Sequence, residues 1–344
     1  MHRASLTSST RARAAPARAT TTKCASSAGR PLERPARSSR ALDVLARASA
    51  TESATSDDDS LTRVRAPANA RPIVVLGGFG NARSDYEDAL GRDEASLAKS
   101  LRDRGFSVHV ARLERKDWAI GVIRGVFTRG FWANACTTRE SYGWYLERAH
   151  ECVEEALAAN PEAKEVDVVA HSAGGWLARA FIGGARALNS GDAACSGDCL
   201  TRDPRVRRLV CLGTPHAQDA KSDPTRGASK WVNDTWPGAY FSPDVRYVCV
   251  TGRAVVGDAR AEPRTVGKYA AGSYAVVAGG NGDGVHGDAV VPNSAALALE
   301  GAETIVIDGC WHSMSTVGTF DEPSRYPWYG SDDVVDTWLR TLLD

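Results

Sequence analysis

The most informative segment of the chain reads Val166-Asp167-Val168-Val169-Ala170-His171-Ser172-Ala173-Gly174-Gly175. Its first four residues form a β-branched run that predicts a buried strand, and the small residues after it predict a helix over 173–185. Only small residues fit two positions before and two after a serine on so sharp a strand-to-helix turn, and Ala170 and Gly174 occupy those positions. The pattern is typical of a nucleophilic Ser172. The plainer alternative is a serine that only caps the helix.

Outward from this segment, apolar strands alternate with amphipathic helices. We expect strands at 73–76, 106–110, 166–169, 208–212, 245–250 and 304–307, and helices at 94–104, 140–158, 173–185 and 332–343. Such alternation predicts an α/β fold with a mostly parallel central sheet and helices on both faces. Ligand sites in such sheets lie at the carboxyl ends of the strands.

A glycine-rich turn, Gly77-Gly78-Phe79-Gly80, follows the first expected strand. Glycines there let the backbone approach a substrate, so the N–H groups of Phe79 and Ala173 are our candidates for an oxyanion hole. The alternative is that these glycines serve only a tight turn.

A nucleophilic serine needs an imidazole to take its proton and a carboxylate to orient that imidazole. Of the seven histidines, His312 follows the last expected strand, whereas His216 and His286 remain as alternatives. Asp288 is the candidate acid because the Val-Val-Pro stretch after it can hold its loop rigid. Competing acids are Asp283, Asp219 and Asp308.

With these pieces in order, the chain resembles the α/β-hydrolase superfamily over nearly all of 70–344. The matching motifs are 77–80, 170–175, Leu212-Gly213-Thr214-Pro215-His216, 287–292 and Gly309-Cys310-Trp311-His312-Ser313. It looks more narrowly like the lipase-like branch that includes bacterial lipases, and it is most similar to plastid-targeted α/β-hydrolases of plants and green algae. The resemblance implies an α/β-hydrolase fold and ester chemistry, while the substrate stays open because fold does not fix function.

The segment 113–136 is a possible lid or cap. Apolar residues at helical spacing and interspersed arginines predict an amphipathic helix within it. It could wall an acyl pocket as a lid, complete the core, or contact a membrane surface peripherally. As tentative pocket residues we take Trp118, Val122, Val126 and Phe127.

The first 65 of the 344 residues differ in composition from the rest. They carry 12 Lys+Arg against 6 Asp+Glu and are rich in Ser, Thr and Ala, which is typical of an organelle transit peptide. We expect a transit peptide and linker in 1–65, addressed to the chloroplast or alternatively to the mitochondrion, and a hydrolase domain in 66–344. A disordered tail without an address is the alternative. The net charge of zero argues against a nucleic-acid binder, and no apolar run is long enough to span a membrane.

The cysteines suggest neither a disulfide framework nor a metal site. Cys211 and Cys249 read as buried strand residues, and the redox state of Cys195 and Cys199 is left open. Cys310, close to His312, could make activity sensitive to thiol reagents. We expect no metal and no cofactor.

The sequence therefore predicts a serine esterase or lipase that cleaves a carboxylic ester, most plausibly of a lipid, through an acyl-enzyme on Ser172. An acyltransferase or thioesterase with the same triad is one alternative. A non-catalytic binding protein on the hydrolase fold is another.

Overall fold

The computed structural model describes residues 63–88, 96–185, 201–219, 221–314 and 326–343. These belong to one compact unit, Asp57–Asp344. The expected transit peptide falls almost wholly in 1–62 and, like Cys195 and Cys199, lies outside the described residues.

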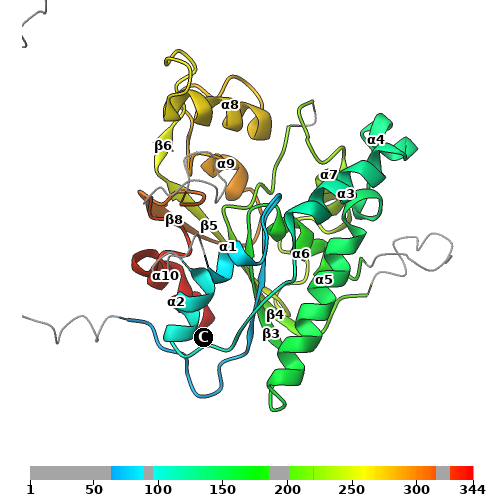
Figure 1. Cartoon of the computed structure of the whole chain (residues 1–344), viewed down its shortest axis with the longest axis vertical. Coiled ribbons are helices and arrows are strands. Elements are labelled where there is room, and N and C mark those ends of the chain that lie inside the picture. The colour runs from blue at the N-terminus through cyan, green and yellow to red at the C-terminus, as the bar shows by residue number, and fades with distance from the viewer. Residues whose placement is uncertain (1–62, 89–95, 186–200, 220, 315–325, 344) are drawn as a thin grey trace, which may run out of the picture. The chain divides into compact units, whose positions relative to one another are not determined.

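Six strands form one sheet in the order β2-β1-β3-β4-β5-β8, and every neighbouring pair is parallel (Figure 1). They are β1 (Ile73–Leu76), β2 (Val108–Val110), β3 (Val166–His171), β4 (Val206–Leu212), β5 (Arg246–Arg253) and β8 (Glu303–Asp308). A small antiparallel pair joins β6 (Val255–Val256) to β7 (His286–Gly287). The predicted α/β fold with a parallel sheet is confirmed.

Ten α-helices also lie within the described residues. They are α1 (Ser84–Glu87), α2 (Leu97–Asp103), α3 (Arg115–Val126), α4 (Arg129–Ala133), α5 (Thr138–Ala159), α6 (Gly174–Ile182), α7 (Ala228–Thr235), α8 (Val266–Ala278), α9 (Asn293–Ala296) and α10 (Asp332–Leu339). Every helix predicted from the sequence is present within a few residues of its expected bounds, whereas α1, α4, α7, α8 and α9 were not predicted.

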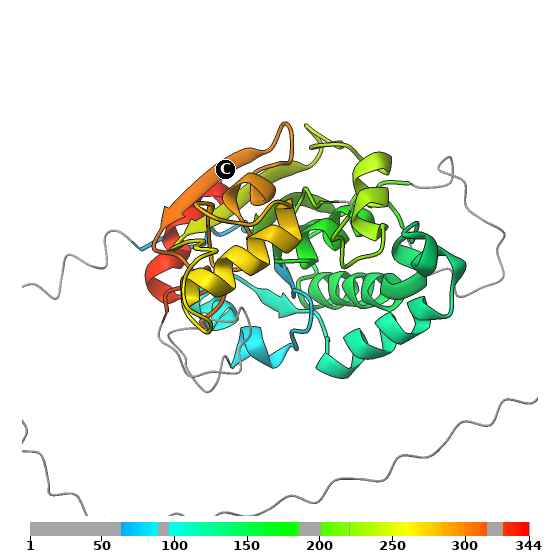
Figure 2. The same cartoon turned by 90° about the horizontal axis from the view of Figure 1, so that it is seen from above.

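Alternating strand residues divide the core into two layers. Val74, Val168 and Cys211 pack with side chains of α3, α5, α6 and α7. Val75 and Val169 point the other way and pack with α2 and α10. Figure 2 shows the sheet between these two sets of helices, as predicted for a parallel sheet covered on both faces. Both Cys211 and Cys249 are buried in the strands, as expected.

The parallel arrangement gathers the candidate residues at one edge of the sheet. Because all six strands run the same way, the turns after β1, β3 and β8 leave from their shared carboxyl edge, and these turns carry Phe79, Ser172 and His312. Asp288 joins them beside the end of β5, since a Cβ placed on Gly252 would lie 3.1 Å from the Asp288 Cβ.

Candidate active site

Ser172 lies on the sharp turn between β3 and α6. Its φ is +54°, a left-handed conformation that costs a non-glycine residue about 1–3 kcal/mol. The Ser172 N–H donates to the Leu212 carbonyl at 2.8 Å and ties the turn to β4. A Cβ at Gly174 would lie 2.6 Å from the Leu76 carbonyl oxygen, so this position requires glycine. The strained serine turn that the sequence predicts is therefore present.

The glycine-rich turn after β1 lies directly against this serine. A Cβ at Gly78 would come within 2.5 Å of the Ser172 Cβ. The turn is held on both sides, because Gly78 N–H donates to Tyr86 Oη at 2.9 Å and Tyr145 Oη donates to the Gly77 carbonyl at 2.8 Å. Among the described residues, the N–H groups of Phe79 and Ala173 donate to no acceptor. These are the two groups expected to form the oxyanion hole.

Asp288 and His312 form a buried pair. His312 Nδ1 lies 2.7 Å from Asp288 Oδ2, and the His312 N–H donates to the Asp288 carbonyl at 2.8 Å. The other carboxylate oxygen accepts from the Val290 and Val291 N–H groups at 3.0 and 2.7 Å. The Val-Val-Pro stretch thus holds the carboxylate, as its sequence suggested.

Two further residues enclose this pair. Tyr329 Oη donates to Asp288 Oδ2 at 2.7 Å and accepts from the Gly252 N–H at 2.7 Å. A Cβ at Gly213, whose φ is +58°, would lie 2.7 Å from Asp288 Oδ2 and 3.0 Å from His312 Nδ1. Burial raises the pKa of Tyr329 well above its usual range, so its hydroxyl remains a proton donor at neutral pH.

The competing acids have other partners. Asp283 accepts from the Ala259 N–H at 3.0 Å, Asp219 from Ser222 Oγ at 3.0 Å, and Asp308 forms an ion pair with Arg253. Of the alternative bases, His216 contacts Cys249 Sγ at 3.4 Å, and His286 is an exposed residue of β7. Of the four acids weighed from the sequence, the structure places only Asp288 against His312.

His171, the residue before the serine, connects the two sides of the site. Its Nε2 lies 2.9 Å from the His312 carbonyl oxygen, which can only accept, so Nε2 carries the proton. Its Nδ1 therefore accepts from Tyr86 Oη at 2.9 Å, and Tyr86 in turn accepts the Gly78 N–H. Burial, with a smaller effect of His312, lowers the pKa of His171 well below its usual range and keeps the ring neutral.

No hydrogen bond joins Ser172 Oγ to the His312 ring within the part of the chain that the structure describes. The His312 ring centroid lies 4.7 Å from that of His171, next to the serine in the chain. Hydrogen bonds of this kind are often long in unliganded sites and tighten when substrate binds.

No protein-family model and no curated protein matches the sequence. The structure is similar in fold, at low identity, to solved lipases and esterases.

The lipase BlEst2 of Bacillus licheniformis in its mature form is 14% identical, with 81% of this chain and 95% of that chain covered and a TM-score of 0.47. The metagenomic carboxyl esterase MGS0156 is 12% identical over 81% and 77%, with a TM-score of 0.45. EstA from Clostridium botulinum is 12% identical over 88% and 97%, with a TM-score of 0.42. The proposed chemistry rests on the geometry of Ser172, Asp288 and His312.

The four tentative pocket residues are not placed alike. Trp118 is buried, donates from Nε1 to the Asn81 carbonyl at 2.9 Å, and contacts the Phe79 ring at a centroid distance of 5.1 Å. Val122 and Val126 are half-buried, whereas Phe127 is 86% exposed. Trp118 thus contacts the glycine-rich turn after β1, which lies against Ser172, whereas Phe127 points to the surface.

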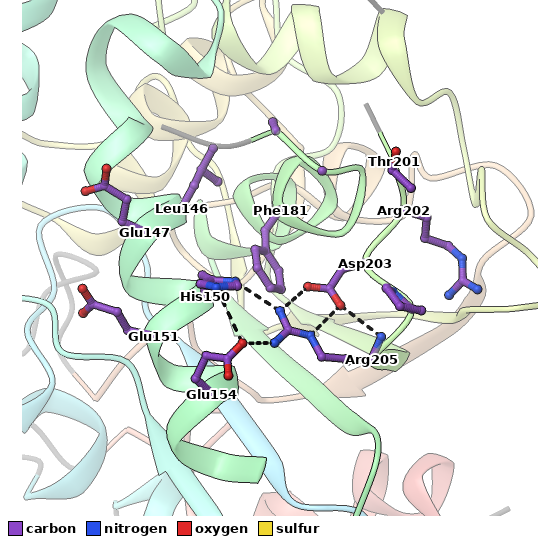
Figure 3. A pocket seen from close by; sticks show the side chains of 13 residues that line it. Leu146, Glu147, His150, Glu151, Glu154, Phe181, Thr201, Arg202, Asp203 and Arg205 are labelled. Carbon is purple, nitrogen blue, oxygen red and sulfur yellow. Dashed lines mark hydrogen bonds and ion pairs between the residues drawn. The ribbon is translucent and has the colours of Figure 1, made fainter. Parts of the chain in front are cut away.

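A cavity of about 600 Å³ lies elsewhere, between α5, the end of α6 and the segment that leads into β4 (Figure 3). Arg205 crosses it and bonds Asp203, Glu154 and His150. None of its lining residues belongs to the site at the carboxyl edge of the sheet. Within the described ranges, no group of three or more His, Cys, Asp or Glu side chains is arranged to hold a metal ion.

Sequence reasoning missed Tyr86 and Tyr329. Tyr86 is 85 positions from its partner His171, and Tyr329 is 41 positions from Asp288. No sequence motif links either pair.

Proposed function

We propose that this protein is a serine hydrolase that cleaves a carboxylic ester through an acyl-enzyme. The buried Asp288–His312 pair, set beside a serine turn with a positive φ, carries the proposal. Ser172 attacks the ester carbonyl, and His312 takes its proton and gives it to the leaving alcohol. Asp288 holds the imidazole in one tautomer. The Phe79 and Ala173 N–H groups stabilise the oxyanion.

Water then completes the reaction. His312 removes a proton from a water molecule, which attacks the acyl carbonyl and releases the acid, while the proton returns to Ser172. Each step uses only this chain's own groups and water. The finer assignment, a lipid ester, is supported by the exposed apolar ring of Phe79 beside the candidate oxyanion hole. A plastid location is proposed from the composition of 1–65 alone.

Hydrolysis of p-nitrophenyl esters with acyl chains of two to sixteen carbons tests the proposal. We expect Ser172→Ala to lower kcat by at least about 10³-fold, while Ser294→Ala, an exposed serine of α9, leaves it unchanged. A fluorophosphonate should label Ser172 in the native protein, and His312→Ala should abolish that labelling.

Turnover that survives Ser172→Ala would refute the assignment of the nucleophile. Absence of both turnover and labelling would favour the non-catalytic binding protein. Addition of alcohol acceptors separates hydrolysis from acyl transfer, because a transferase forms a new ester in place of the free acid.

A further inference from the structure

The outer side of α3 and α4 carries large apolar side chains that the fold leaves in water. They are Ile120, Ile123 and Phe127 at the spacing of one helix face, and Trp132 on α4; Phe127 is 86% and Trp132 73% exposed. We call these four residues, with Arg124 and Arg129, the α3–α4 face. Figure 1 shows both helices beside the upper end of α5.

The inner side of α3 explains why the apolar residues face outward. Trp118, Gly121 and Gly125 form its buried stripe against α5. A Cβ at Gly121 would lie 2.5 Å from the Ser141 carbonyl oxygen, and one at Gly125 would lie within 2.2 Å of Ser141 Oγ. The helix therefore packs through Trp118 and its glycines, and Ile120, Ile123 and Phe127 are not used for the core.

The aromatic side chain on α4 is held in place. Trp132 Nε1 donates to the Val126 carbonyl at 2.8 Å, and its ring meets Phe131 edge-on at 5.6 Å. Thr128 caps the helix through its side chain. The exposure of Trp132 is thus built into the local structure.

The charges of this face have one sign. Between Asp117 and Glu140 the sequence has three arginines and no acidic residue. Arg124 and Arg129 form no ion pair with any residue that the structure describes. By contrast, Arg115 pairs with Asp85 and Lys116 with Glu114. Unpaired cations among aromatic and aliphatic side chains are the pattern of helices that lie in a phospholipid headgroup layer.

The inner side of the same helix adjoins the candidate active site. Phe79, which is 56% exposed, contacts the buried Trp118 of α3 at a ring-centroid distance of 5.1 Å, and Gly78 adjoins Ser172. The helix that carries the α3–α4 face on its outer side therefore packs against the glycine-rich turn of the site on its inner side.

We propose that the α3–α4 face docks this protein on an anionic phospholipid surface, with the aromatic side chains at the acyl boundary and Arg124 and Arg129 on lipid phosphates. The docking itself stands without catalysis. Its role in bringing a lipid ester to Ser172 rests on the proposed function.

Vesicle flotation with the full chain carrying Ser172→Ala tests the docking without any turnover. Vesicles of phosphatidylcholine with and without phosphatidylglycerol serve as probes. We expect binding to the anionic vesicles, lowered about tenfold or more by Phe127→Ser with Trp132→Ser and about fivefold for each of Arg124→Gln and Arg129→Gln. The matched controls are Tyr240→Ser, an exposed aromatic elsewhere, and Lys164→Gln with Lys221→Gln, two exposed lysines that pair with no acidic side chain among the described residues. All of them should bind like the parent.

Each other outcome overturns the proposal. Absence of binding would do so, as would binding that all variants share, which would place it in another segment such as the basic residues of 1–65. A dimer in gel filtration that Phe127→Ser with Trp132→Ser dissociates would make the face an interface between two copies. Because the parent for these assays is inactive, none of these results depends on whether the esterase assay succeeds.

Discussion

Tyr86 and His171 form a hydrogen-bonded chain from the Gly78 N–H, beside the proposed oxyanion donor, to the carbonyl of His312. The two loops of the candidate site therefore share one set of buried polar contacts. Because burial raises the pKa of Tyr86 and lowers that of His171, neither ring changes its charge near neutral pH. Each group in this hydrogen-bonded chain therefore keeps its role as donor or acceptor.

Tyr86→Phe should break this chain at its centre. The Gly78 N–H loses its acceptor in a buried position, which costs about 1–3 kcal/mol of the free energy of unfolding. We expect kcat for a soluble ester to fall about tenfold with little change in KM, because a displaced Gly78 moves the neighbouring Phe79 N–H. Urea unfolding and steady-state kinetics measure the two effects, with Tyr240→Phe, an exposed tyrosine, as control. An unchanged kcat together with lower stability would show a purely structural role.

Sequence reasoning at this scale succeeded where a local frame existed. Asp288 could be chosen over Asp283 because Val-Val-Pro stands beside it, and its carboxylate does bond the N–H groups of Val290 and Val291. Tyr86 and Tyr329 could not be found this way, since their partners lie far along the chain and are brought to them only by folding.

Among the elements, α3 shows what hydrophobic periodicity cannot reveal. Its apolar residues were read as a stripe, yet the helix buries Gly121 and Gly125 and leaves Ile123 and Phe127 outside. A count of apolar residues gives glycine no weight, although its missing side chain is what allows the backbone to approach α5 so closely. Gly267 and Gly272 likewise lower the helix propensity of the segment that forms α8, so propensity did not predict this helix.

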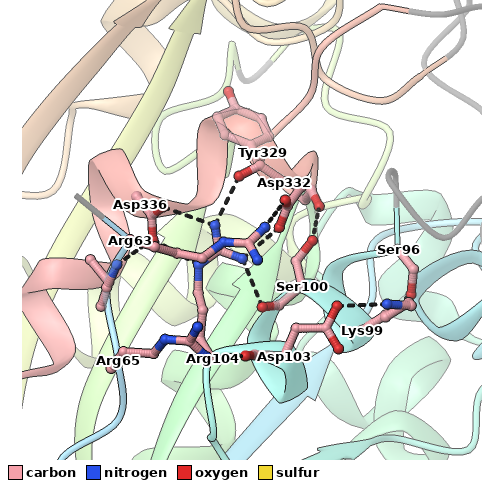
Figure 4. Close-up of polar contacts among 12 residues, drawn as sticks. Arg63, Arg65, Ser96, Lys99, Ser100, Asp103, Arg104, Tyr329, Asp332 and Asp336 are labelled. Carbon is pink, nitrogen blue, oxygen red and sulfur yellow. Dashed lines mark hydrogen bonds and ion pairs between the residues drawn. The ribbon is translucent and has the colours of Figure 1, made fainter. Parts of the chain in front are cut away.

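The contact between α2 and α10 depends on Arg104 (Figure 4). Its side chain is fully buried and bonds Asp332 at 2.6 Å and Asp336 at 2.7 Å, next to the segment that carries Tyr329. Arg104→Met keeps the volume but leaves both aspartates without this cation. We expect a loss of about 2–4 kcal/mol at pH 7, measured by urea unfolding.

The Arg104–Asp336 ion pair also predicts how the stability of the fold depends on pH. Burial, the largest single effect, would raise the pKa of Asp336, but the hydrogen bonds and charge of Arg104, with smaller effects of the Val64 N–H and Arg63, together lower this pKa below its usual value. A lowered folded pKa stabilises the fold above the unfolded value and loses that effect as pH falls through the folded one. The difference between parent and Arg104→Met should thus persist to about pH 5 and narrow only below about pH 4. Equal stability at pH 7, with Lys99→Met as exposed control, would contradict the role given to Arg104.

For the whole molecule, the strand list and the parallel sheet followed from the sequence, because buried strands read as continuous β-branched runs. A site built from turns far apart in the chain was expected because the candidate residues follow predicted strands, and ligand sites in such sheets lie at the carboxyl ends of the strands. The contact of α2 with α10 arises from packing between helices, and so do the exposed apolar side chains of α3. No sequence pattern within a single helix predicts either feature.

The cysteines report on the stability of the whole fold. Cys136, Cys152, Cys211, Cys249 and Cys310 are free and buried. Burial raises the pKa of Cys136 to about 11, that of Cys152 to about 12 and that of Cys310 well above its usual range, so little thiolate forms near neutral pH. The burial of Cys310 and its raised pKa argue against the sensitivity to thiol reagents expected from its place near His312.

A variant with Cys24, Cys195 and Cys199 replaced by serine should show no fast thiol with Ellman's reagent and five after denaturation. Esterase activity, assayed on the same sample, should persist through prolonged treatment. Rapid labelling of any of the five in the native state, located by mass spectrometry, would contradict the burial described here.

The edge position of β8 has a consequence for the protein during its synthesis. His312 follows this last strand, which pairs with β5, and Tyr329 comes still later. A nascent chain that has left the ribosome only as far as Glu300 already holds Ser172 and Asp288 but lacks His312, the base proposed to activate the serine. On the proposed mechanism such a chain, or any fragment cut before β8, cannot cleave an ester, and activity requires the segment after β8 that carries His312.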